Sequence, residues 1–105
     1  MIKIIFIGTS DFGVPSLEAL IKNPECKIIA AITQPDKPIG RKQILTAPAI
    51  KGTALKYNIP VFQPEKIKNL QAKIKELAPN LIIVAAYAQI IPKNILDIPK
   101  YGCVN

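Results

Sequence analysis

The chain has 105 residues, of which 50% are hydrophobic and 20% charged, so it can bury the core of one domain and is not a disordered chain. It contains no histidine, which excludes histidine acid–base catalysis, Ser-His-Asp triads and most zinc sites built from these residues alone. Lys and Arg number 14 against 7 Asp and Glu, and the resulting charge of +7 fits an anionic partner such as RNA or a phosphorylated ligand, or simply a soluble lysine-rich surface.

The first predicted element is a buried strand over residues 2–7, a short β-branched run that ends at Gly8. A small polar loop, residues 9–13, leads from this strand to a helix that the Asn23-Pro24 pair ends. The apolar face of that helix holds Val14, Leu17, Leu20 and Ile21.

A second strand is predicted over residues 27–33, followed by a long irregular loop over residues 34–43 with two prolines and one glycine. The cationic side chains of this loop are those of Lys37, Arg41 and Lys42. Because almost no apolar residue is available to pack there, we expect the loop to be mobile in the free protein and ordered by its partner.

The rest of the chain continues the alternation of helices and strands. It predicts a helix from Pro48, a strand over 60–62, a helix over 66–78, a strand over 81–86, a short helix over 92–97 and the start of a strand over 101–105. This pattern predicts an α/β fold, a Rossmann-like parallel sheet with flanking helices, in the strand order third, second, first, fourth, with the fifth strand beside the fourth. We expect a fragment truncated at the start of that fifth strand.

Four segments are predicted to meet at the carboxyl edge of this sheet, where ligands of such folds bind. They are residues 8–13, 34–43, 87–91 and Asn105. Gly8 allows a close backbone approach, and Gly8, Ser10 and Asp11 are expected at the rim of a substrate site. The first segment lacks the G-x-G-x-x-G and G-K-[ST] spacings, so the alternative to a site is an ordinary strand-to-helix turn.

Two further features at this edge suit chemistry on a flat ligand. Residues 87–91 offer apolar side chains and free backbone groups, which fits a heteroaromatic ring, or else a hydrophobic loop that covers the sheet. The amide of Asn105 can donate a hydrogen bond to a developing oxyanion, although an asparagine at a strand end is more often a cap or turn residue.

Four stretches of the chain resemble the methionyl-tRNA formyltransferase family. They read IIFIGTSDFGVPSLEAL at 4–20, TQPDKPIGR at 33–41, IPVFQP at 59–64 and GCVN at 102–105. The resemblance covers nearly the whole chain, and the second stretch is the most specific, because related folate-dependent formyltransferases differ there. It implies that residues 1–105 are the N-terminal part of a Rossmann-like formyltransferase domain, whose remainder and C-terminal β-barrel domain are absent.

The resemblance also implies an activity. The family transfers a formyl group from 10-formyltetrahydrofolate to the amino group of methionine on initiator tRNA in translation initiation. The implied partners are therefore initiator methionyl-tRNA and the folate, with no metal and no membrane, in a monomeric full-length protein.

The site residues follow from the same resemblance by position. Asn105 matches the catalytic asparagine, and the basic loop with Lys37, Arg41 and Lys42 matches the loop that enters the acceptor end of the tRNA. The wall of the pterin pocket is matched by Tyr87, Ala88, Gln89, Ile90 and Ile91. The catalytic histidine of the family lies just beyond Asn105 and its aspartate further on, so we expect residues 1–105 alone to be inactive.

Two alternatives remain open at this point. One is a folate-dependent formyltransferase with a small acceptor, a purine precursor or nucleotide sugar, although a small acceptor needs no long cationic loop. The other is a non-catalytic RNA-binding module, which would need exposed aromatic platforms, whereas only 6% of the residues are aromatic.

Cellular location is indicated by what the sequence lacks. No apolar run reaches the roughly 18 residues that span a bilayer, and Lys3 interrupts the apolar amino terminus without a signal-peptide pattern. Cys26 and Cys103 have no metal-ligand spacing, so we expect reduced thiols in a cytoplasmic protein.

Overall fold

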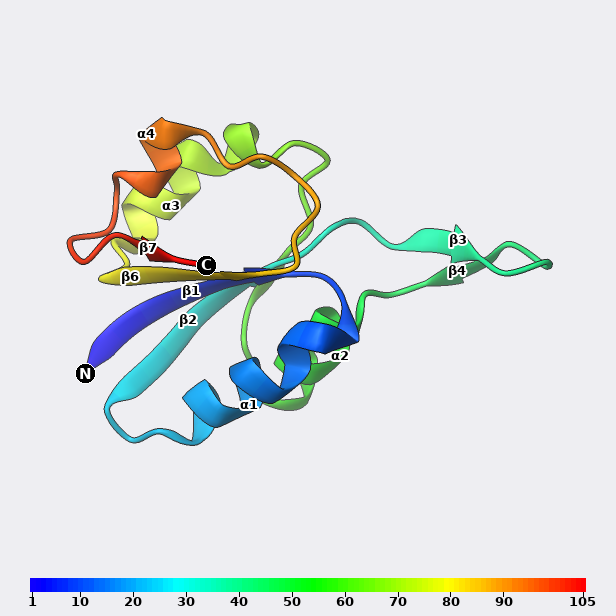
Figure 1. Cartoon of the computed structure of the whole chain (residues 1–105), viewed down its shortest axis with the longest axis horizontal. Coiled ribbons are helices and arrows are strands. Elements are labelled where there is room, and N and C mark those ends of the chain that lie inside the picture. The colour runs from blue at the N-terminus through cyan, green and yellow to red at the C-terminus, as the bar shows by residue number, and fades with distance from the viewer.

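A computed structural model describes all 105 residues and contains one five-stranded parallel sheet (Figure 1). The strand order is β5-β2-β1-β6-β7, which confirms the predicted Rossmann-like order. The strands are β1 (Ile2–Gly8), β2 (Cys26–Ile32), β5 (Val61–Phe62), β6 (Leu81–Ala85) and β7 (Cys103–Val104).

Helices cover both faces of the sheet. In Figure 1, α1 and α2 lie on one face and α3 and α4 on the other. The helical segments are η1 (Asp11–Gly13), α1 (Val14–Lys22), α2 (Ala49–Lys56), η2 (Ile67–Leu70), α3 (Gln71–Leu77) and α4 (Lys93–Leu96), where η marks a 3₁₀ turn. The helix predicted over 66–78 is therefore split, with a 3₁₀ turn first, and it ends where Ala78 adopts the left-handed conformation at φ 49°.

Strand β1 is the centre of the sheet and is buried on both faces. Ile4 and Phe6 belong to the core under α1 and α2, while Ile5 and Ile7 belong to the core under α3 and α4. All four are 1% exposed or less, and burying a side chain of this size stabilises a fold by about 1.5–3 kcal/mol. The β-branched run at the amino terminus is thus the scaffold on which the sheet edge is built.

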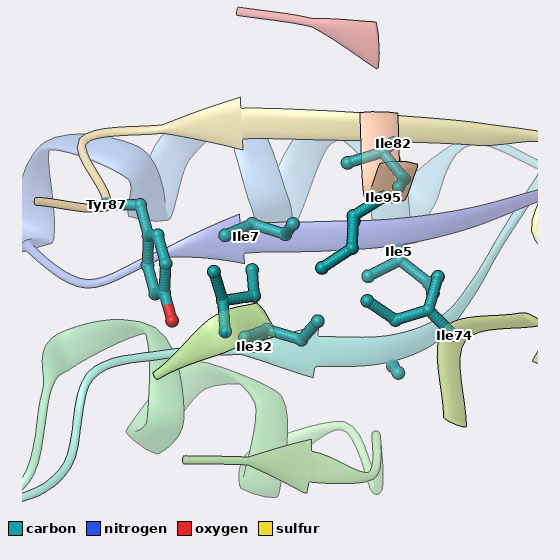
Figure 2. Close-up of a cluster of buried hydrophobic side chains, with 9 residues drawn as sticks. Ile5, Ile7, Ile32, Ile74, Ile82, Tyr87 and Ile95 are labelled. Atoms are coloured by element: carbon teal, nitrogen blue, oxygen red, sulfur yellow. The ribbon is translucent and has the colours of Figure 1, made fainter. Parts of the chain in front are cut away.

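The core under α3 and α4 also holds a residue from a loop. Figure 2 shows Tyr87, which follows β6, beside Ile7 and Ile32 at the carboxyl ends of their strands. Ile74 of α3 and Ile95 of α4 complete this core from the helix side. The loop after β6 is therefore packed onto the sheet through Tyr87.

Residues 34–43 do not form the irregular loop that the sequence predicted. Most of them belong to an antiparallel hairpin of β3 (Lys37–Ile39) and β4 (Ile44–Thr46), which projects away from the sheet and helices (Figure 1). The hairpin forms because Ile39 pairs with Ile44, and because the turn is closed by Gly40 at φ 79° and by the Gln43 N–H, which donates to the Gly40 carbonyl at 3.2 Å.

The longest helix, α1, has nine residues, and no helix combines the length and the apolar character that crossing a bilayer requires.

Candidate functional site

The carboxyl ends of β1 and β6 lie very close together. A Cβ atom added at Gly8 would be 2.5 Å from the Ala85 carbonyl oxygen, and one added at Gly13 would be 3.2 Å from the Ala85 Cβ. The Thr9 N–H donates to the Ala86 carbonyl at 3.2 Å, which continues the contact one residue further. The close approach predicted at Gly8 is confirmed.

One pocket opens between the loop after β6 and the end of β7, and we call it the β7 pocket. Its volume is about 330 Å³. It is lined by Val84, Gln89, Ile90, Ile91, Leu96, Cys103, Val104 and Asn105. Apolar side chains therefore form most of the wall, and the amide of Asn105 lies beside three of the five loop residues that the sequence selected.

The other two selected loop residues, Tyr87 and Ala88, do not line the β7 pocket. Tyr87 is only 3% exposed, and its hydroxyl is buried without a hydrogen-bond partner. This burial disfavours the phenolate and raises the pKa of Tyr87 to about 12. The side chain of Tyr87 therefore packs in the core and holds the loop that forms part of the pocket wall, without lining the pocket itself.

The loop backbone around Tyr87 is strained. Ala86 and Ala88 have φ values of 56° and 64°, in the left-handed region that costs a residue with a Cβ roughly 1–2 kcal/mol. The flanking anchors, the buried ring of Tyr87 and the hydrogen-bonded amide of Gln89, hold these conformations.

The predicted basic residues occupy the hairpin. Lys37 begins β3, while Arg41 and Lys42 lie in the turn, and all three are exposed. Ile39, Ile44 and Leu45 of the same hairpin are 51%, 62% and 67% exposed. The hairpin thus presents cationic and apolar side chains together, and none of them is buried in the protein's own core.

A second pocket, which we call the hairpin pocket, opens at the base of the hairpin and has a volume of about 370 Å³. It is lined by Thr9, Ser10, Asp11, Pro35, Lys37, Ile39, Thr46, Ala47, Pro48 and Ala49. Ser10, Asp11 and Lys37 are therefore brought together as predicted for one edge of the sheet. Asn105 lies in the other pocket, and Arg41 and Lys42 line neither.

The base of the hairpin is fixed by a cluster that the sequence analysis missed. Lys51 of α2 donates to both carboxylate oxygens of Asp36 at 3.2 Å, and the Gln63 amide donates to Asp36 at 2.6 Å. The hydrogen bond from Gln63, and then Lys51, hold the pKa of Asp36 below its usual value. No three His, Cys, Asp or Glu side chains gather as a metal site would require.

Comparison with known protein families identifies the chain. The formyl transferase family model matches residues 2–105. The chain belongs to the formyl transferase family. It is 53% identical over 108 residues to the methionyl-tRNA formyltransferase of Clostridium acetobutylicum, covering 100% of this chain and 34% of that protein. It is 49% identical over 107 residues to that of Bacillus subtilis, covering 100% and 33%.

The family resemblance drawn from the sequence is thus confirmed, and the chain spans about a third of the length of the curated relatives it matches. Among solved structures, the phosphoribosylglycinamide formyltransferase of Bacillus halodurans matches with a TM-score of 0.67 at 14% identity, covering 96% of this chain and 53% of that one. This likeness, at low identity, supports the formyl transferase fold.

Asp36 and Gln63 lie within two of the stretches that carry the family resemblance, Thr-Gln-Pro-Asp at 33–36 and Phe-Gln-Pro at 62–64, whereas Lys51 lies outside them. The sequence did contain a signal for this cluster, because Asp36 and Gln63 are polar residues that closely follow two strands predicted to be neighbours. Sequence reasoning gave Asp36 and Gln63 no role because their partner Lys51 lies on α2, and no local spacing links the three.

Proposed function

We propose that this chain is the N-terminal part of a Rossmann-like formyltransferase domain, in a longer protein that ends with a β-barrel domain. That protein transfers a formyl group from 10-formyltetrahydrofolate to the amino group of methionyl initiator tRNA. The proposal is supported by about 50% identity to relatives of that name over the whole chain. We further propose that the full-length protein is a cytoplasmic monomer that acts in translation initiation.

The observation that carries the proposal is the composition of the β7 pocket. Apolar side chains and the backbone of the loop after β6 suit a flat pterin ring, which needs apolar walls and hydrogen bonds to its edge. Asn105 lines the same pocket, and we propose that its amide faces the formyl group that the bound ring system carries. We propose that Gln89, Ile90 and Ile91 wall this donor site, with Tyr87 and Ala88 shaping the loop.

The proposed role of Asn105 is electrostatic. The methionyl amine attacks the formyl carbon, a C–N bond forms, and negative charge develops on the formyl oxygen. An amide N–H of Asn105 donates to that oxygen, and collapse of the tetrahedral species breaks the bond to N10 of the folate. The amine loses one proton and N10 gains one, a transfer we assign to the histidine and aspartate that the family carries beyond residue 105.

The hairpin is the proposed acceptor side. Lys37, Arg41 and Lys42 are exposed on a projecting element, as contacts to the phosphates of a tRNA acceptor end require. Ser10 and Asp11, which share the hairpin pocket with Lys37, are proposed to face the end of the acceptor. A glycinamide ribonucleotide or nucleotide sugar, the alternative acceptor class, would leave most of this hairpin without a contact.

A non-catalytic RNA-binding module is less well supported. Phe12 and Tyr101 are the exposed aromatic residues, at 82% and 62%. Phe12 lies in η1, after the carboxyl end of β1, whereas Tyr101 lies before the amino end of β7. The strands are parallel, so the two residues are at opposite edges of the sheet and form no common stacking platform.

The decisive experiment offers different acceptors to the full-length protein. With 10-formyltetrahydrofolate as donor, we expect transfer to methionyl initiator tRNA and none to glycinamide ribonucleotide, measured as formylated product. The 105-residue chain is the matched control and should give no turnover. Preferred transfer to the small acceptor, or turnover by the 105-residue chain, would contradict the proposal.

A further inference from the structure

A line of hydrogen bonds, made by side chains and by the backbone carbonyl of Gln34, runs along the carboxyl edge from the base of the hairpin to the loop after β6. At the hairpin end, the amide of Gln63 donates both to Asp36 and, at 3.2 Å, to the Gln34 carbonyl oxygen. At the other end, the Gln89 Nε2 donates to the Gln34 Oε1 at 2.8 Å. Gln34 and Gln89 are 55 residues apart in sequence, so this amide pair bridges two separate segments.

The amide of Gln89 is held by the backbone as well as by Gln34. Its Nε2 also donates to the Glu65 carbonyl at 2.9 Å, and its Oε1 accepts from the Ile67 N–H at 3.0 Å. Those two backbone partners fix which end of the amide is the donor. Gln34 must therefore present its side-chain oxygen, and the bridge has one defined polarity.

Gln34 stands where the hairpin leaves the sheet. Its N–H donates to the Thr9 hydroxyl at 3.4 Å, its carbonyl accepts from the Thr33 hydroxyl at 3.0 Å, and the Asp36 cluster follows two residues later. Gln34 therefore belongs to the base of the hairpin, and its side chain is the part that reaches the loop after β6. The next partner along the line is Gln89, which precedes Ile90 and Ile91 in the wall of the β7 pocket.

We infer that Gln34 and Gln89 are positioning residues that couple the two substrate sites, so that occupation of the hairpin by the acceptor changes the affinity of the β7 pocket for the donor. The inference rests on the proposed function, which supplies an acceptor for the hairpin and a donor for the pocket. Neither side chain needs to touch a reacting atom. Because such coupling is reciprocal, the donor changes the affinity for the acceptor by the same factor.

The test measures the dissociation constant of 10-formyltetrahydrofolate on the full-length protein with and without saturating uncharged initiator tRNA, which cannot accept the formyl group. The wild-type ratio of the two constants should differ from one by about fivefold or more, the usual lower range of such coupling. Gln34→Ala should bring the ratio close to one, since the bridge is the only hydrogen bond that this side chain makes.

Three further variants separate coupling from general loosening of the fold. Gln34→Glu should keep the wild-type ratio, because a carboxylate oxygen still accepts from Gln89. The double variant Gln34→Ala/Gln89→Ala should bring the ratio no closer to one than Gln34→Ala does, because the bridge is already lost in the single variant, even though Gln89→Ala also removes the hydrogen bonds to Glu65 and Ile67. Asn94→Ala, which breaks a similar exposed amide pair with Gln71 on α3 and α4, should leave the ratio unchanged.

A ratio of one in the wild type, or a Gln34→Ala ratio equal to that of the wild type, overturns the inference. The same wild-type preparation is assayed for formyl transfer to methionyl initiator tRNA. Normal transfer with either of those ratios overturns the coupling alone and leaves the proposed function standing, whereas absence of transfer overturns both.

Discussion

The hairpin β3–β4 and the loop after β6 leave the same edge of the sheet and are ordered in opposite ways. The hairpin has a regular backbone, with three residue pairs from Lys37–Thr46 to Ile39–Ile44, but its side chains are exposed. The loop has an irregular backbone with two alanines in the left-handed region, but Tyr87 is buried and Gln89 is hydrogen-bonded. One region is held by main-chain pairing and the other by side chains.

This difference fits what each region is proposed to bind. A projecting hairpin with free cationic and apolar side chains can meet a large surface and adjust to it. A loop held at its side chains presents a fixed wall, which suits a small rigid ligand that must be oriented for reaction. On this comparison, we expect the loop side to govern the chemistry and the hairpin side to govern acceptor binding.

The largest effect is expected at Asn105, on the loop side. Loss of one oxyanion donor usually lowers kcat by about 10² to 10³-fold. Asn105→Ala in the full-length protein should therefore lower kcat by roughly that factor and change KM for either substrate much less, in steady-state assays. The control is Asn94→Ala, an exposed amide on α4. A defect confined to KM would make Asn105 a binding residue.

The second effect concerns the edge from which both regions leave. The added methyl group of Gly8→Ala would lie 2.5 Å from a backbone oxygen, so β1 and β6 must separate, and overpacking of this kind costs about 1–3 kcal/mol. The free energy of unfolding, from urea titration, should fall by that amount. Gly52→Ala in α2, where nothing lies within 4 Å, should instead raise it by about 0.5–1 kcal/mol. Equal results for both glycines would refute the close packing.

The third effect belongs to the hairpin. Arg41→Ala should lower kcat/KM for charged tRNA by roughly tenfold at low salt, as expected for a lost hydrogen bond to a charged group, and leave folate binding nearly unchanged. The defect should shrink as salt rises, because phosphate contacts are screened in both proteins. Arg41→Lys should restore part of the activity if the fork of the guanidinium matters and all of it if charge alone matters.

The control for Arg41 is Lys75→Ala, which removes an exposed charge from α3. Kinetic assays at two salt concentrations, beside a folate titration, separate the two substrates. Normal tRNA kinetics for Arg41→Ala at low salt would remove the hairpin turn from the acceptor site.

The smallest effect is expected beneath the loop. Tyr87→Phe removes a buried hydroxyl that has no partner, so the free energy of unfolding should rise by about 1 kcal/mol. Tyr101→Phe, at an exposed position, should change it by less than about 0.5 kcal/mol. Thermal or urea unfolding measures both. A loss of stability in Tyr87→Phe would mean that the hydroxyl contributes a hydrogen bond.

The strand order was predictable because it rests on long-range rules applied to strong local patterns. Runs such as residues 2–7 and 81–86 are too apolar for an exposed strand, and right-handed crossovers then leave few possible orders. The same rules bring Asn105 to the edge near residues 89–91, and the β7 pocket contains both.

The hairpin and the polar line were not predictable in the same way. Gly40 and the prolines suggested an irregular loop. The two strands of the hairpin have only three residues each, which is too short for an alternating pattern to be recognised in the sequence. The contacts of Asp36 with Lys51 and of Gln34 with Gln89 depend on side-chain directions in the folded edge. Such directions cannot be read from sequence spacing. For the same reason, the sequence did not show that the ring of Tyr87 is buried in the core and does not line the pocket.

The pairing of β1 with β6 has a consequence for synthesis of the chain. Ile4 of β1 pairs with Leu81 of β6, while β2, the other neighbour of β1, pairs with it from Cys26 onward. A ribosome adds about 5–20 residues per second, so β6 is synthesised roughly 4 to 15 s after β1, and β1 lacks its second neighbour until then. During that interval the edge of β1 that will pair with β6 is open to a chaperone or to another nascent chain.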